Sequence, residues 1–153
     1  MKAFTQAVLI SVFCALAASC ATTPPEVIEV LNRAQCQQAA TGLAQISIED
    51  VARLRGAMLI DGPTGDENDV HSVLLSVSRG PQPTPGYGFR LQSFDLSAST
   101  LEIQLSWSEP PAGTVQAQMI THPCIVLGVI APELQTVRVV DQNGEIGALT
   151  LER

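Results

Sequence analysis

The chain has few aromatic side chains, with one Trp, one Tyr and four Phe in 153 residues. Its core must therefore be built mainly from Val, Ile and Leu, which favour strands. Basic residues are also scarce, at 8 Lys and Arg against 15 Asp and Glu, and the formal net charge is −7. Because no basic stripe or aromatic platform is present to follow a phosphate backbone, we expect no nucleic-acid partner.

Motifs for catalysis and for metal or nucleotide binding are lacking as well. The chain has no Gly-x-Ser-x-Gly elbow, and no glycine-rich loop that could hold a phosphate precedes a helix. The two histidines, His71 and His122, fall on a predicted strand and in a turn, where ordinary surface histidines are the simpler interpretation. The acidic stretch 61–69 lacks the ligand spacing of a calcium loop. We therefore expect a non-catalytic protein without a cofactor or a metal.

The first 19 residues have the pattern of an export signal. Lys2 supplies a positive charge, an apolar run covers 3–16, and small residues precede Cys20. This run is shorter than the roughly 20 residues that span a bilayer as a helix, so a permanent membrane helix is the weaker interpretation. We expect residues 1–19 to be a lipoprotein signal peptide.

Two cleavage sites compete at the end of this signal. Residues 15–17 (ALA) suit ordinary signal peptidase, whereas 16–20 (LAASC) resemble a lipobox whose Leu stands one place too early. Cleavage at the first site would leave Cys20 as an odd thiol beside Cys36 and Cys124 in an oxidising compartment. The sequence therefore favours a lipid on Cys20, with a plain secreted protein as the alternative. The two remaining thiols, Cys36 and Cys124, are expected to form a disulfide.

Residues 20–26 are expected to tether a single domain, 27–153, to a membrane. Pro24 and Pro25 favour an extended backbone and resist helix. Ala21, rather than Asp, follows the lipidated cysteine, which in a Gram-negative bacterium resembles an outer-membrane sorting signal. We therefore expect a lipid anchor in the outer membrane, with the domain facing the periplasm. The length of the domain suits one hydrophobic core.

Hydrophobic patterns predict a mainly β domain with one or two short helices. A short helix is expected within 26–38, and another over 49–59, the second preceded by a capping pair of Ser47 and Asp50. The strands that follow alternate between apolar and polar residues, most strictly in the strand that ends at Trp107, whose apolar face we expect to be buried in the core. They are predicted over 70–78, 87–96, 101–107, 115–120, 124–130, 137–142 and 145–151.

Two local features refine this picture. Near Gln92 and Ser93 the apolar side chains of the predicted strand change from odd-numbered to even-numbered positions, which indicates a β-bulge. Asn143 and Gly144 separate the last two strands, and this pair suits a type I′ hairpin because both turn positions need positive φ. Short strands joined by Pro and Gly turns predict an antiparallel β-sandwich or a partly open barrel.

Several motifs, in their order along the chain, resemble the PrcB family. They are a strand at 72–78, RGPQPTPGY at 79–87, EPPAG at 109–113 and QMITHP at 118–123. The resemblance covers about 42–130. The chain departs from the family at two places. It has Pro85-Gly86-Tyr87 where the family usually has Gly-Gly-Tyr, and it lacks the tryptophans that are common on the family's first helix. The family is named for a lipoprotein subunit of a bacterial surface protease complex, and the resemblance transfers no catalytic residue.

The loop between the first two predicted strands is the candidate partner-binding site. Pro81, Pro83 and Pro85 restrict its backbone, and Gly86 and Tyr87 complete it. A stiff loop loses little entropy when it is bound. The alternative is a rigid connection with Tyr87 packed in the core.

Two classes of function follow. The resemblance implies a protein-binding subunit or regulator of a surface or periplasmic protease. The alternative is a structural envelope lipoprotein with no connection to a protease.

Overall fold

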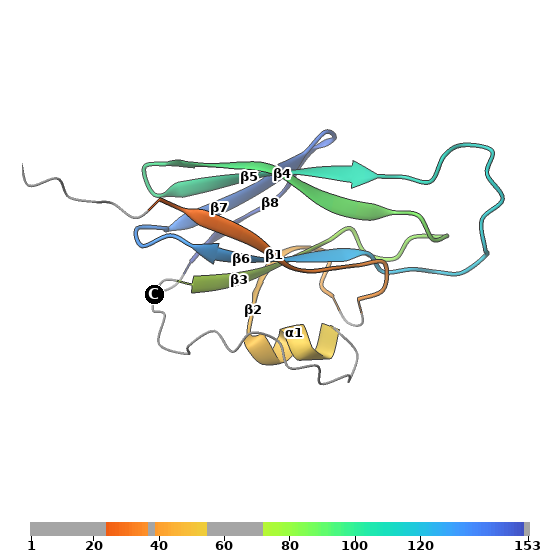
Figure 1. Ribbon diagram of the computed structural model, residues 1–153, viewed down its shortest axis with the longest axis horizontal. Helices are drawn as coiled ribbons and strands as arrows, with labels where there is room; N and C mark the ends of the chain where they lie inside the picture. The colour runs from red at the N-terminus through yellow and green to blue at the C-terminus, as the bar shows by residue number, and fades with distance from the viewer. Residues whose placement is uncertain (1–23, 37–38, 55–71, 152–153) are drawn as a thin grey trace, which may run out of the picture.

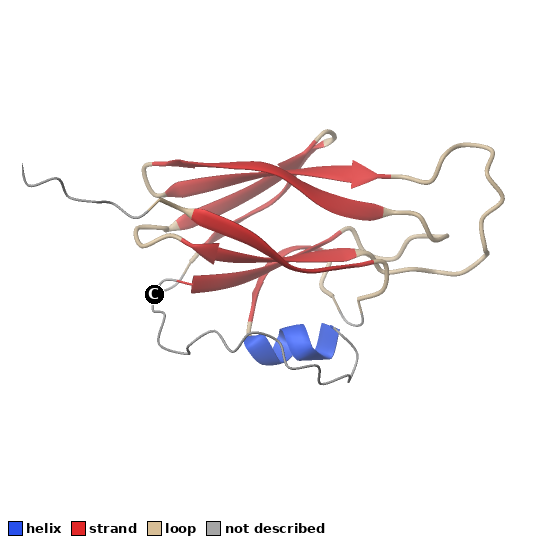
Figure 2. Ribbon diagram, viewed as in Figure 1, coloured by secondary structure: helices blue, strands red, loops and turns tan. Residues whose placement is uncertain are grey.

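The computed structural model describes residues 24–36, 39–54 and 72–151. In these ranges, eight strands form two four-stranded sheets that pack face to face, and one short helix lies outside them (Figures 1 and 2). The expected mainly β, sandwich-like fold is therefore confirmed. The predicted signal peptide, 1–19, and Cys20 lie outside the described residues.

The first sheet has the order β1-β6-β3-β2, and all its pairs are antiparallel. Its central strand β6 carries the continuous apolar sequence CIVLGVI, as a strand covered on both faces should. One face of β6 meets the second sheet, and the other meets a cluster that includes helix residues. The strands are β1 (Glu26–Arg33), β2 (Gly42–Ile46), β3 (Ser72–Ser78) and β6 (Cys124–Ile130).

The second sheet has the order β4-β5-β7-β8. Its strands are β4 (Gly88–Ser97), β5 (Thr100–Ser108), β7 (Thr136–Asp141) and β8 (Gly144–Thr150). The expectation of purely antiparallel pairing is wrong at one place, because β5 and β7 are parallel. Between these two strands the chain crosses to the first sheet as β6, and it therefore returns in the direction in which it left.

The core fills the space between the sheets. In β5 the alternating residues Leu101, Ile103, Leu105 and Trp107 are all buried, as predicted. In β4 the pairing with β5 shifts register between Leu91 and Ser93, which confirms the predicted bulge. At one side of the sandwich, the Asn32 side chain donates a hydrogen bond to the Phe89 carbonyl (2.8 Å) and links β1 to β4.

The helix expected within 26–38 is wrong, because Glu26–Arg33 is the edge strand β1. A register shift between Glu29 and Leu31 explains the error. Val27 faces the core between the sheets, whereas Val30 and Leu31 belong to the cluster on the outer face of the first sheet. A bulge thus produces the i, i+3, i+4 spacing that otherwise indicates a helix.

The second predicted helix is present as α1 (Ile48–Leu54), and residues 55–59 of the prediction lie outside the described residues. The expected cap is formed, since Asp50 N–H donates to Ser47 Oγ (3.2 Å) and Ser47 N–H donates to Asp50 Oδ2 (2.9 Å). The backbone hydrogen bond from Ser47 lowers the pKa of the Asp50 carboxyl. Val51 and Leu54 are buried against the outer face of the first sheet.

The C-terminal hairpin is present, but its turn is not type I′. Asp141 pairs with Gly144, so Gln142 and Asn143 occupy the turn, and Gly144 has a φ of 122°. Among the described non-glycine residues only Ala98 has a positive φ, so Asn143 does not adopt the conformation that was expected. Its N–H instead donates to Asp141 Oδ1 (2.8 Å), a local contact that favours an ordinary turn.

The predicted disulfide between Cys36 and Cys124 is present, with a Cα–Cα distance of 5.9 Å. Both residues are fully buried. The bond joins the segment that follows β1 to the first residue of β6.

Candidate functional site

Two loops meet at one end of the sandwich, and we call this the loop end. The first, 79–87, connects β3 to β4, and the second, 109–123, connects β5 to β6. Figure 1 shows the second loop projecting beyond the ends of both sheets. The strand predicted over 115–120 is wrong. This part of the loop lies beyond the ends of the strands in both sheets, and no described strand pairs with it.

Hydrogen bonds hold the two loops together. Gln82 and Thr121 form an antiparallel bridge, in which each N–H donates to the other carbonyl at 2.7 and 2.9 Å. The buried Thr121 hydroxyl donates to the Thr84 carbonyl (3.0 Å). Residues on both loops are therefore fixed relative to each other.

Close packing of glycines adds to this attachment. Gly86 has a φ of 102°, and a Cβ there would lie 3.0 Å from Pro110 Cβ. Gly80 has a φ of 75°, and a Cβ there would lie 2.8 Å from the Thr41 hydroxyl oxygen. A larger residue at Gly86 would push the first loop away from Pro110 of the second, and one at Gly80 would push the first loop away from Thr41, in addition to the backbone strain.

The predicted partner-binding residues divide into an exposed and a packed group. Pro81, Pro83 and Gly86 are exposed, whereas Pro85 and Tyr87 are half-buried. Tyr87 packs against the core cluster, as the alternative interpretation expected. The loop thus offers exposed prolines on a backbone that its packed residues hold in place.

An aromatic cluster of Tyr87, Phe89 and Trp107 packs where the first loop meets β4 and β5. Trp107 stacks on Tyr87 with 5.6 Å between ring centroids, and the Phe89 ring lies tilted against it with 4.7 Å between centroids. The Trp107 indole N–H donates to Glu109 Oε1 (3.2 Å). Its backbone N–H and carbonyl both bond to the side chain of Gln142, at 2.9 and 2.5 Å. The ring is buried, which confirms its predicted place in the core.

Arg79 connects this cluster to the β7–β8 hairpin. Its guanidinium carbon lies 5.3 Å from the centroid of the Trp107 ring, within range of a cation–π contact. The same group forms an ion pair with Asp141, whose side chain is fully buried. Sequence reasoning did not find this contact, since no local pattern joins two residues so far apart in the chain.

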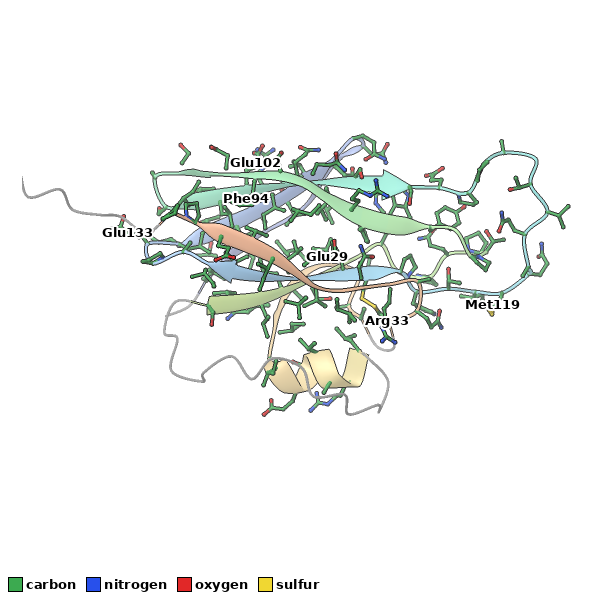
Figure 3. All side chains as sticks on the ribbon, viewed as in Figure 1. Glu29, Arg33, Phe94, Glu102, Met119 and Glu133 are labelled. Carbon is green, nitrogen blue, oxygen red and sulfur yellow. A yellow bond between two sulfur atoms is a disulfide. The ribbon has the colours of Figure 1, made fainter. Side chains whose placement is uncertain are left out.

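Exposed apolar side chains gather on the second loop. Val115 is 102% exposed, Met119 57% and Ile120 63%. Figure 3 shows Met119 on the part of this loop that lies beyond the strands. Large apolar residues that are grouped and exposed mark an interaction surface more often than isolated ones do.

The described residues contain no group of three or more His, Cys, Asp or Glu that could hold a metal ion. His122 uses its backbone to donate to the Ala34 carbonyl (3.2 Å) and to accept from Cys36 N–H (2.8 Å). His71 and the acidic stretch 61–69 lie outside the described residues.

A separate small hollow of about 200 Å³ lies under α1, lined by residues that include Ile46, Leu54 and Ser76. None of its lining residues belongs to the loop end.

In the part of the chain that the structure describes, no helix is long and apolar enough to cross a membrane.

Comparison with known protein families gives a match to part of the chain. Residues 73–129 match the family described as PrcB C-terminal. The matched segment includes nearly all of β3, all of β4 and β5, most of β6, and both loops of the loop end. No curated protein and no solved structure matches the chain. The resemblance inferred from the sequence is therefore confirmed over residues 73–129, which are similar to the PrcB family.

Proposed function

We propose that this protein is a non-catalytic envelope lipoprotein that binds another protein through its loop end, as a subunit or regulator of an envelope protease. The observation that carries the proposal is the loop end, in which a first loop held by hydrogen bonds lies beside the exposed apolar residues of the second, all within the segment that matches the family. A surface held in place before binding loses little entropy when a partner docks. The protease connection rests on the family alone.

The position of the loop end relative to the expected tether supports this proposal. In the first sheet Glu26, where β1 begins, pairs with Ile130, whereas Arg33 at its other end pairs with Cys124. The loop end adjoins Cys124, so it lies at the end of the sandwich opposite Glu26 (Figure 1). A lipid on Cys20 would therefore leave the loops pointing away from the membrane and open to a partner.

The proposal is tested by affinity capture of the tagged full chain from the envelope of its own bacterium. Proteins that copurify are identified by mass spectrometry and assayed for proteolytic activity. We expect a protease among them. Its yield should fall when residues of the loop end are substituted, and it should not change when residues at the opposite end of the sandwich are substituted. Capture of no protein, or of proteins without any protease among them, would favour the structural lipoprotein instead.

A further inference from the structure

Residues 114–120 of the second loop have the pattern of a strand, but no strand among the described residues pairs with them. Val115, Ala117 and Met119 alternate with Gln116 and Gln118, which is the pattern of a strand with one apolar face. From Val115 to Ile120 the one described backbone hydrogen bond joins Met119 N–H to the Ala117 carbonyl (2.9 Å), a three-residue turn. The remaining peptide groups of this stretch are open to pairing with another chain.

The order of side chains is nearly the same in both directions from Ala117. Gln116 mirrors Gln118, and Val115 mirrors Met119. If two copies met antiparallel with Ala117 opposite Ala117, each Gln would face a Gln and each Val a Met. A two-fold interface requires this reciprocity, in which residue i of one copy contacts j of the other and j contacts i.

The distribution of charge also favours a second copy at this place. The chain has a net charge of −7, yet residues 110–121 contain no charged side chain. Like charges repel strongly only within about 10 Å at ordinary salt. The tip of the second loop is therefore a place where two acidic molecules can meet with little repulsion.

We propose that two copies of this chain pair through residues 114–120 as an antiparallel two-stranded ribbon centred on Ala117. The turn around Gln118 opens on pairing, and the exposed Val115 and Met119 become cross-strand neighbours. One short strand pair buries less than the roughly 1,200 Å² of a standard interface, so the dimer is weak and depends on concentration. This pairing does not depend on the proposed partner protein, and either can fail alone.

A charge exchange tests the register. The full chain and two double variants, Val115→Glu with Met119→Glu and Val115→Lys with Met119→Glu, are compared by sedimentation equilibrium over a range of concentrations. The first places Glu opposite Glu in the paired strands, and the second places Lys opposite Glu. We expect the association constant of the first to be at least about tenfold lower than that of the second.

A crosslinking experiment tests the same register without changing charge. In an antiparallel pair, opposite Cα atoms are about 4.5 to 5.5 Å apart, within the range of a disulfide. Ala117→Cys should therefore link two copies under oxidising conditions. Val115→Cys is the matched control, because its two copies would lie four positions apart, about 13 Å along the strands. The unchanged chain measures the background from its own cysteines.

Three results would overturn the pairing. They are an unchanged chain that is monomeric at every concentration, equal association of the two charged variants, and crosslinking of Val115→Cys as efficient as that of Ala117→Cys. Thermal melting of each variant checks that the domain remains folded, and the exposure of the changed residues leads us to expect that it does.

Discussion

Arg79 and Asp141 form an ion pair across 62 residues of sequence, and it joins the first loop of the loop end to the β7–β8 hairpin. The Asp141 side chain is fully buried, whereas the Arg79 side chain is 32% exposed. A buried carboxylate without its partner is costly, so this contact should contribute to the stability of the loop end.

Asp141→Ala should lower the free energy of unfolding by about 2 kcal/mol. Removing one member of a buried pair costs about 3 to 5 kcal/mol, but Arg79 can regain water because a third of it is exposed. Urea unfolding measures the change. Glu102→Gln is the control, since its pair with Arg138 is about half exposed on both sides and should matter little. Equal effects of the two changes would contradict the role of burial.

The cap of α1 predicts a dependence of stability on pH. The pKa of Asp50 is lowered from its ordinary value of 3.8 by the hydrogen bonds from Ser47. A lowered folded pKa means that the carboxylate stabilises the fold above pH 3.8 and that this contribution is lost as the pH falls through the folded pKa. Asp50→Asn should therefore be less stable than the unchanged protein at neutral pH and equal to it in strong acid. A constant difference at all pH values would contradict this.

The disulfide closes a separation of 88 residues. In the chain-entropy account a bond of this span limits the unfolded state by about 4 to 5 kcal/mol, and strain in the folded state reduces that value. Replacing Cys36 and Cys124 together with Ala should lower the urea midpoint strongly. In the denatured, unreduced state, the unchanged protein and the double variant should titrate the same number of thiols, and two additional thiols in the unchanged protein would refute the bond.

Cys20→Ser should release the protein from membranes, because it removes the acceptor of the expected lipid. Fractionation of cells followed by immunoblotting measures the distribution. An unchanged membrane fraction, or an intact mass that shows a free N-terminus at Ala18, would show that no lipid anchors the unchanged chain at this position.

Pro83→Gly combined with Pro85→Gly should weaken capture of the partner while changing the melting temperature little. Glycine gives the unbound loop more conformations to lose on binding. Pro132→Gly, in the turn between β6 and β7 at the opposite end of the sandwich, is the control and should leave capture unchanged. If the double variant unfolds, or if it captures as much partner as the unchanged chain, the loop is only a connector.

Sequence patterns predicted those strands whose side chains alternate without interruption or are apolar throughout. The core face of β5 and the ends of β6 were found because burial on one or both faces leaves a direct signal in the residues. β1 was missed because a bulge in its middle changes which side chains face the core, and this breaks the alternation of a strand. The segment 115–120 was taken for a strand because its pattern is that of a strand, whereas pairing also requires a neighbour that only the fold can supply.

The candidate site was predictable only in part. The prolines of the first loop were visible in the sequence, because a rigid backbone is a property of the residues themselves. The contacts of Arg79 with Asp141 and of Trp107 with Gln142 depend on how distant strands are brought together. The parallel pairing of β5 with β7 was unpredictable for the same reason, since it follows from the excursion of the chain into the other sheet.

The pairing of β1 has a consequence for the order of folding. Among the described residues its strand partner is β6, and Glu26 lies opposite Ile130, a separation of 130 − 26 = 104 residues. A chain that emerges N-terminus first, from a ribosome or a secretion channel, cannot close this sheet until most of its length is out. Such non-local contacts slow folding and leave apolar strands exposed in the meantime. A chain of this topology that is exported, as the first residues predict, would stay unfolded enough to be translocated, and its apolar strands would be exposed until β6 arrives.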